Sequence, residues 1–322
     1  LEGFRFRLDP SAEAEQVPTL RAAALAALAP VYILRAEKFY NAPDTEIDVT
    51  EQGGLMWGEH AVGSVPRGAD PLSPEVEPFV DDDAPPEIAE KVRRRLGHWL
   101  ERRIKALFEP LIGLRDDAEL SGLSRGVAFR LVEGLGVLPR GEVASDMKAL
   151  DQAARASLRR HGVRFGQYTV FMPALLKPAP TRFRLLLWAL SQDLEVVPDS
   201  PPPGLVTVPA LPGAPSGYYA RAGYRLCGER AIRIDMLERV ADLLRPLDAR
   251  AGFEATPDML SITGLGLDGF ASLLEGLGFT AERGTRPKAA ARTPGTAAEG
   301  EAPAPAAETP PDISADATPP LD

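Results

Sequence analysis

Positively charged side chains gather within residues 148–184, although the chain as a whole carries a formal net charge of -10. From Asp151 to Leu190 there are seven Lys or Arg residues and one acid. Guanidinium and ammonium groups displayed together bind phosphate groups through charge-assisted hydrogen bonds. These residue types therefore indicate binding of a phosphate backbone. The candidate residues of this segment are Lys148, Arg155, Arg159, Arg160, Arg164, Tyr168, Lys177 and Arg182.

Spacing predicts that the first part of this segment is a helix with two different faces. Apolar residues recur every three or four positions, which is the period of a buried helix face. Gly162 then ends the predicted helix. Lys148, Arg155 and Arg159 share another face with Gln152, so the cations are expected to form a stripe away from the buried row. That row consists of Val143, Met147, Leu150, Ala154 and Leu158.

The chain alternates between polar and apolar residues from Val163 to Met172, which predicts a strand. Alternation places Arg164 and Tyr168 on one side of this strand and Phe165 on the other. An arginine beside a tyrosine can stack a nucleic-acid base. A second interpretation stays open, in which the aromatic residues belong to the core and the cations form a solvated helix face.

A second group of cations lies on a long helix predicted to begin near Pro86. Between Pro86 and Arg115 there are eight Lys or Arg residues and four acids. The apolar residues of this helix recur at helical spacing and form its buried row. Its other faces are basic, and a solvated face is again the alternative to a phosphate-binding one. The candidates here are Arg93, Arg94 and Arg102.

Two glycine-containing motifs match catalytic or cofactor-binding patterns but lack the required surroundings. The serine-hydrolase pattern G-x-S-x-G at 122–126 falls in a predicted helix, whereas a nucleophilic Ser124 requires a strand before it and an acid and a histidine in order after it. The pattern G-x-G-x-x-G at 264–269 has no strand before it and no βαβ unit around it. There is also no P-loop sequence. No motif in this chain is therefore predicted to carry catalysis.

Composition predicts a soluble, multi-part, cytoplasmic protein. The chain has 322 residues, of which 44% are hydrophobic, and no run of about 18 apolar residues that would predict a membrane span. It has neither a signal sequence nor an initiator Met, and its opening at Phe4 resembles the middle of a strand, so we expect a piece of a longer protein. The single cysteine, Cys227, and three dispersed histidines favour neither disulfides nor a metal site.

The expected fold class is α+β, predominantly helical and built of several parts. Residues 1–85 are predicted to hold an opening strand, a helix and a small acidic β-meander, because 41–83 carry eleven acids and one base. Residues 86–192 are predicted to form a basic helical domain with the strand from Val163 to Met172. Seven prolines within 193–217 predict a linker or a long extended connection.

Residues 218–283 are predicted to form a winged-helix-like domain. Extended segments at 218–227 and 231–234 precede helices that begin near Asp235, Thr256 and Asp268, and residues 279–282 are expected to form a final strand. A plain three-helix arrangement is the alternative. Residues 284–322 have eight prolines and no aromatic residue, which predicts a disordered acidic tail rich in Pro and Ala.

Four sequence blocks, at 148–151, 158–166, 173–180 and 223–230, carry a resemblance to a known family. They resemble the C-terminal region of bacterial superfamily-two helicases related to the RNA helicase of the mitochondrial degradosome. The resemblance covers most of residues 1–282 and is weak in the acidic meander and the tail. In that family, two RecA-like motor domains that use ATP and Mg²⁺ precede this region, and this chain lacks their motifs.

The resemblance implies an accessory region that guides single-stranded RNA or DNA beside a helicase motor in the same protein, with RNA-decay proteins as further partners. ATP hydrolysis would then occur outside this chain, and no cofactor is expected within it. The alternative is a protein-interaction platform that docks partners through its acidic meander and tail. The net charge favours the platform, whereas the segregation of charge favours nucleic-acid binding.

Overall fold

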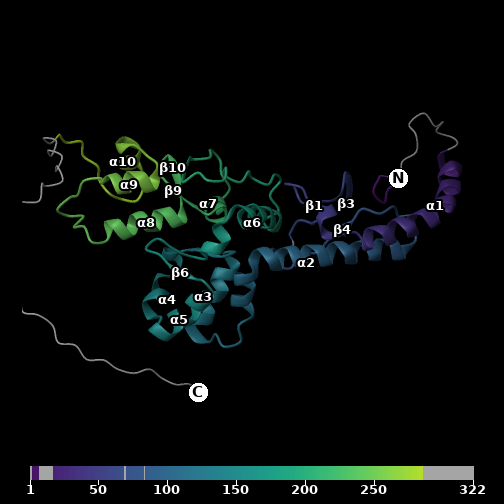
Figure 1. Ribbon diagram of the computed structural model, residues 1–322, viewed down its shortest axis with the longest axis horizontal. Coiled ribbons are helices and arrows are strands. Elements are labelled where there is room, and N and C mark those ends of the chain that lie inside the picture. Colours follow the sequence, from purple (N-terminus) through teal and green to yellow (C-terminus); the bar gives the residue numbers. More distant parts are fainter. Residues whose placement is uncertain (1, 7–16, 69, 83, 286–322) are drawn as a thin grey trace, which may run out of the picture. The chain divides into compact units, whose positions relative to one another are not determined.

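A computed structural model describes residues 2–6, 17–68, 70–82 and 84–285 (Figure 1). The described residues form an α+β fold with ten α-helices and three small antiparallel sheets. Residues Leu1–Ala281 form one compact unit. The remaining residues form a second unit, and all of the predicted tail beyond residue 285 lies outside the described residues.

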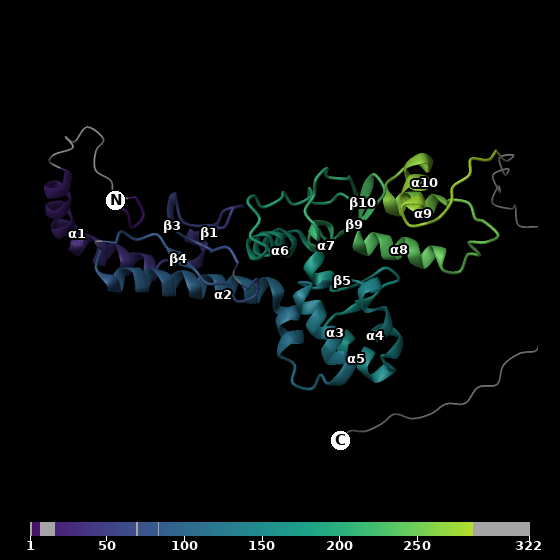
Figure 2. The ribbon, with the colours of Figure 1, turned by 180° about the vertical axis from the view of Figure 1, so that it is seen from behind.

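The first sheet contains four consecutive strands that lie beside two long helices. Its strands are β1 (Ile47–Val49), β2 (Gly54–Trp57), β3 (His60–Ser64) and β4 (Glu77–Pro78), in that order. Both views place this sheet alongside α2 (Pro86–Asp116), which also packs against α1 (Val17–Tyr40) (Figures 1 and 2). The contact is close, because a Cβ atom at Gly63 would lie 2.7 Å from Leu96 Cδ1.

Helix α2 is long because its apolar residues recur at helical spacing and it begins at a proline that needs no hydrogen bond from its nitrogen. It kinks near its end. Phe108 has the non-helical dihedral angles φ -116° and ψ 20° two residues before Pro110, whose ring prevents a regular helical hydrogen bond. Its buried row begins with Ile88, Val92 and Leu96.

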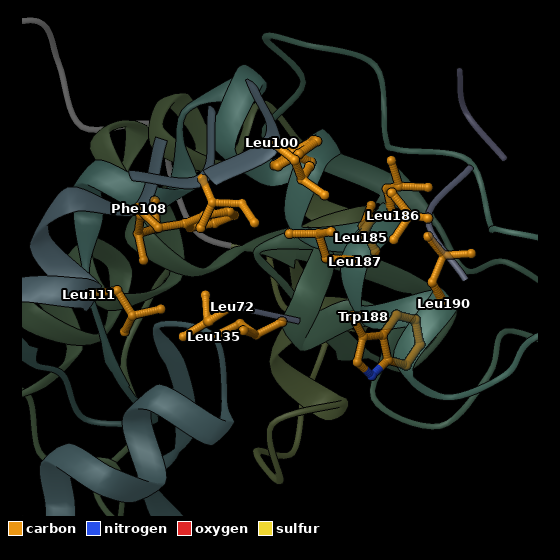
Figure 3. Close-up of a cluster of buried hydrophobic side chains, with 14 of the residues drawn as sticks. Leu72, Leu100, Phe108, Leu111, Leu135, Leu185, Leu186, Leu187, Trp188 and Leu190 are labelled. Carbon is orange, nitrogen blue, oxygen red and sulfur yellow. The ribbon is translucent and has the colours of Figure 1, made fainter. Parts of the chain in front are cut away.

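The second sheet and its helices hold most of the predicted binding residues. Strands β5 (Val137–Pro139), β6 (Arg164–Phe165) and β7 (Thr169–Phe171) lie in the order β5-β7-β6. Helices α3 (Gly122–Glu133), α4 (Ala144–Ala149) and α5 (Gln152–Arg160) belong to the same part of the chain. Helix α6 (Pro178–Ser191) is almost entirely buried, and its leucines pack with residues of α2 in the cluster that Figure 3 shows.

The third sheet lies in the C-terminal part, with strand β10 (Arg230–Arg233) between β8 (Thr207–Pro209) and β9 (Tyr224–Cys227). Its helices are α7 (Tyr218–Ala222), α8 (Ile234–Leu244), α9 (Pro257–Thr263) and α10 (Leu267–Glu275). Thr256 caps α9 by accepting a hydrogen bond from the nitrogen of Met259, at 3.3 Å. This cap agrees with the sequence prediction of a helix start there.

The helix predicted through Val143 and Leu158 is two helices. Leu150 and Asp151 are extended between α4 and α5, and the Asp151 carboxylate accepts a hydrogen bond from the nitrogen of Ala154 at 2.7 Å. An aspartate that caps a new helix in this way stabilises a break that hydrophobic spacing does not reveal. The apolar row therefore continues across two separate helices.

The strand predicted from Val163 to Met172 is a hairpin. Strands β6 and β7 are joined by a turn in which the nitrogen of Gly166 donates to the carbonyl of Thr169 at 2.8 Å. The alternation of side chains continues through the turn, so the pattern alone does not separate a hairpin from one longer strand.

Two smaller expectations were wrong in the C-terminal half. The segment 218–227, which was expected to be extended, begins with helix α7. Within the Pro-rich segment 193–217, Thr207–Pro209 forms β8 and pairs with β10. Residues 279–282 form no strand, because the Phe279 nitrogen donates to the carbonyl of Leu274 and its ring packs against Phe253.

Candidate nucleic-acid interface

Helix α5 presents two arginines to one aromatic ring of the hairpin. The Arg155 and Arg159 Cζ atoms lie 5.9 and 5.5 Å from the centroid of the Phe165 ring. These guanidinium groups are attracted by the negative face of the ring. We call Arg155, Arg159 and Phe165 the α5 cluster. Helix α5 contains three arginines and no acid, so its surface is locally basic in an acidic chain.

The two arginines of the α5 cluster differ in their exposure and in their hydrogen bonds to the rest of the protein. Arg155 is half-buried and donates to the carbonyls of Met147 and Leu150, which helix α4 leaves without partners at its C-terminal end. Arg159 is exposed, and no carboxylate of the described residues pairs with it. Arg159 is therefore available to an outside phosphate, whereas Arg155 has a structural role.

The neighbouring cations do not extend the α5 cluster into one continuous stripe. Arg160 pairs with Glu119 at 3.5 Å through two side chains that are both well exposed. Lys148 is exposed on α4, on the other side of the break at Leu150. The stripe was predicted on a single helix, and that part of the prediction is wrong because the helix is interrupted at Leu150 and Asp151.

Arg164 and Tyr168 do not form the predicted stacking pair. Arg164 is paired with Phe171 in the sheet. Because neighbouring residues of a strand point to opposite faces, Arg164 lies on the other face of the sheet from Phe165. The Tyr168 ring instead faces Arg225, whose Cζ atom is 5.0 Å from the ring centroid. Sequence reasoning missed Arg225, because no spacing rule relates residues 57 positions apart.

Tyr168 is half-buried and packs beside a small buried cluster that includes Cys227, Ile232 and Leu237. Burial raises the pKa of the Tyr168 hydroxyl above its ordinary value. The surroundings therefore favour the interpretation in which this aromatic residue belongs to the protein interior. Burial also raises the pKa of the Cys227 thiol, to about 11, which leaves it protonated and unreactive at neutral pH.

The hairpin turn is fixed by a buried carboxylate from helix α8. Glu238, which is 8% exposed, accepts backbone hydrogen bonds from Gln167, from Tyr168 at 3.0 Å and from Thr169 at 2.8 Å. Burial raises the pKa of Glu238, and the three backbone N–H groups oppose that rise. This carboxylate holds the turn in place beside the α5 cluster.

The predicted cations of α2 are engaged with the protein itself. The Arg102 guanidinium donates to both oxygens of Asp44, at 2.8 and 2.7 Å, and Arg95 donates to the same carboxylate at 2.8 Å. The Arg102 hydrogen bonds lower the pKa of Asp44 to about 2, and burial opposes that effect. Arg93 pairs with Glu90 at 2.7 Å, and Arg94 lies over the ring of Tyr40.

The two predicted cations of α6 stand apart from the α5 cluster. Arg182 pairs with Glu51 at 3.1 Å, and both side chains are well exposed. Lys177 is exposed at the residue that precedes α6. Helix α6 begins at Pro178, and the Thr181 hydroxyl in its first turns donates to the carbonyl of Leu175 at 3.2 Å.

No protein-family model, curated protein or solved structure matches this chain. Among the described residues, no helix is both long and apolar enough to cross a bilayer.

Proposed function

We propose that this chain is a nucleic-acid-binding accessory region that holds single-stranded RNA at the surface of helix α5. The observation that carries the proposal is Arg159, an exposed cation over the Phe165 ring on a helix that has no acid. Phosphates bind such an arginine, and a nearby ring offers a surface to a base. A structural explanation competes with this one, because arginines at the end of a helix also interact favourably with its dipole.

The resemblance of the sequence blocks to helicases extends this proposal. The chain would act in the cytoplasm beside an ATP-dependent motor, which would bind ATP and Mg²⁺ and hydrolyse the nucleotide outside these residues. The accessory region would contribute affinity for the strand and no chemistry of its own. RNA-decay proteins would be the further partners.

Salt titration of single-stranded RNA binding tests the proposal. Fluorescence anisotropy of a labelled oligonucleotide, measured from about 50 to 200 mM salt, reports the number of phosphates that the protein neutralises. Arg159→Ala is expected to weaken binding and to lower the salt slope by about one. Arg93→Ala is the matched control, because Arg93 is a helical arginine already paired with Glu90. Equal binding by the parent and Arg159→Ala would defeat the proposal.

A protein-interaction platform is the second candidate, and the arginines of α2 favour it. Asp44 pairs with both Arg95 and Arg102, so these two cations of the helix serve the fold. Several acids of the first sheet remain exposed, among them Asp48, Glu59 and Glu77. If the parent bound neither single-stranded RNA nor DNA at about 50 mM salt, the platform would replace the nucleic-acid proposal.

A further inference from the structure

A cavity of about 770 Å³ has no residue of the α5 cluster in its lining. One wall is a face of α3 that includes Arg125, Phe129 and Glu133, and the C-terminal end of α2 forms another. Further lining residues come from 68–72, from the end of α6 and from Arg221 of α7. Figure 3 shows three of the apolar lining residues, Leu72, Leu135 and Trp188. The volume of the cavity is in the range of sites that bind small organic ligands.

Arg221 in the cavity wall and Arg184, which is bonded to it, lack the carboxylate partners that buried cations normally have. The Arg221 Nε atom is buried without an acceptor among the described residues, and its Nη2 atom donates only to the Glu133 carbonyl at 3.4 Å. Arg184 does not line the cavity; it is fully buried, donates to the Arg221 carbonyl at 2.6 Å and to the Leu135 carbonyl at 3.3 Å, and leaves its buried Nη2 atom without an acceptor among the described residues. A bound anion would offset the unfavourable burial of this charge.

Burial lowers the pKa of both arginines. Burial, and after it the charge of Arg221, lower the pKa of Arg184 to about 9. Burial also lowers the pKa of Arg221, and the negative charge of Glu142 opposes this effect. Because arginine side chains stay protonated in proteins, Arg221 brings positive charge to the wall of the cavity.

The same cavity offers aromatic surface. Phe129 is 63% exposed and follows Arg125 by four residues on α3, so the ring and the guanidinium group share one face of the helix. Trp188 is a second lining ring, and its Nε1 atom makes no hydrogen bond within the described part of the chain. An exposed phenylalanine beside an arginine is a platform on which a flat ring can stack.

Acidic side chains complete the lining and narrow the class of ligand. Asp70, Asp117 and Glu133 line the cavity, and Asp117 is already bonded to His161 at 2.7 Å. Carboxylates would repel a bare inorganic anion, but they accept hydrogen bonds from sugar hydroxyl groups. The combination of arginines, rings and carboxylates matches a ligand that has phosphate, base and sugar together.

We infer that this cavity binds a nucleoside phosphate, with the phosphate at Arg125 and Arg221, the base against Phe129 and the sugar hydroxyls at the carboxylates. The ligand can be a free nucleotide or one unit of a single strand. The site is separate from the α5 cluster, and the inference does not rest on the function proposed for that surface.

Equilibrium dialysis of the full chain with AMP and with UMP tests this site directly. We expect saturable binding that weakens at least about tenfold in the double variant Arg125→Ala/Phe129→Ala, because both a charged contact and a stacking surface are lost. Both side chains are exposed, so the variant should fold. Leu123→Ala is the matched control, since Leu123 is an exposed residue of α3 that does not line the cavity.

Further arms of the experiment separate the sources of the ligand and the two proposals. A trinucleotide without terminal phosphates, bound more tightly than AMP or UMP and weakened by the same double variant, would identify the unit of a strand as the ligand. Arg159→Ala should leave nucleotide binding unchanged even if it abolishes RNA binding. The inference is overturned if AMP, UMP and the trinucleotide all fail to bind, if the double variant binds them like the parent, or if inorganic phosphate competes as strongly as AMP.

Discussion

Gly166 and Glu238 approach each other so closely that no side chain fits between them. A Cβ atom at Gly166 would lie 2.2 Å from the Glu238 Cδ atom and 2.4 Å from its Oε2 atom. The carboxylate cannot move aside freely, because three backbone N–H groups of the turn hold it in a buried position. A glycine in the hairpin and an acid in α8, 72 residues later, are therefore one structural unit.

Gly166→Ala is expected to lower the free energy of unfolding by about 1–3 kcal/mol, the usual range for forcing a methyl group into packed surroundings. Urea unfolding followed by circular dichroism measures this change. Gly126→Ala is the control, because Gly126 lies within α3 and a Cβ atom there would meet nothing within 4 Å. That control should gain about 0.5–1 kcal/mol from the better helix propensity of alanine. A Gly166→Ala protein as stable as the parent would show that the turn can move.

Glu238→Gln tests the same unit from the other side. The amide keeps the size of the carboxylate, but its NH₂ group cannot accept hydrogen bonds from the turn. We expect a loss of about 1–3 kcal/mol and faster hydrogen exchange at the amides of Gln167, Tyr168 and Thr169. Asp242→Asn is the matched control, because Asp242 is an exposed acid that follows on α8 and pairs only with Arg245 among the described residues. Unchanged exchange at the turn would contradict the assigned role.

Local patterns predicted the elements whose causes lie within a few residues. The small β-meander predicted within residues 1–85 corresponds to β1, β2 and β3, since Gly-containing turns are visible in the sequence. The long helix from Pro86 was predicted from its proline and its apolar period. The hairpin at β6 and β7 was not, because the acid that holds its turn is about 70 residues away.

The candidate site was harder to predict than the fold, because exposure and pairing are tertiary properties. Arg102 and Arg159 are both arginines on basic helices, and sequence gives no reason to separate them. The two arginines differ by one ion pair in the structure. Asp44 pairs with Arg102, whereas no acid of the described residues pairs with Arg159. No pattern in the sequence predicts the cavity beside Phe129, because its lining residues come from five separate segments of the chain.

Substitutions of Tyr168 distinguish a packing role from a base-stacking role. Tyr168→Ala is expected to lower the free energy of unfolding by about 2 kcal/mol, because a half-buried ring beside Arg225 is lost. Tyr168→Phe should change it by less than about 0.5 kcal/mol, since the hydroxyl makes no hydrogen bond within the described residues. RNA affinity per folded molecule should be unchanged in both variants. A folded Tyr168→Ala protein with weakened binding would restore the stacking interpretation.

Acid should weaken the contact between Asp44 and the arginines of α2. The hydrogen bonds from Arg102, with those from Arg95, lower the pKa of Asp44 from 3.8 to about 2 in the folded protein. Because the folded-state pKa is the lower one, the stabilisation is present above about pH 4 and is lost as the pH falls toward 2. Urea unfolding of the parent and of Asp44→Asn should therefore differ more at about pH 5 than at about pH 2.5. A constant difference would contradict the assignment.

The arginines around β6 should contribute unequally to RNA binding, because they lie on different faces of the hairpin. Arg159→Ala should lower the salt slope of single-stranded RNA binding by about one. Arg164→Ala should leave this slope nearly unchanged if the bound RNA follows α5. Arg155→Ala should act mainly on stability, since it removes hydrogen bonds to the carbonyls of Met147 and Leu150. Anisotropy titrations and urea unfolding of the three variants separate these effects. Equal slope changes for Arg159→Ala and Arg164→Ala would show that the bound strand crosses the edge of the sheet and does not follow the helix.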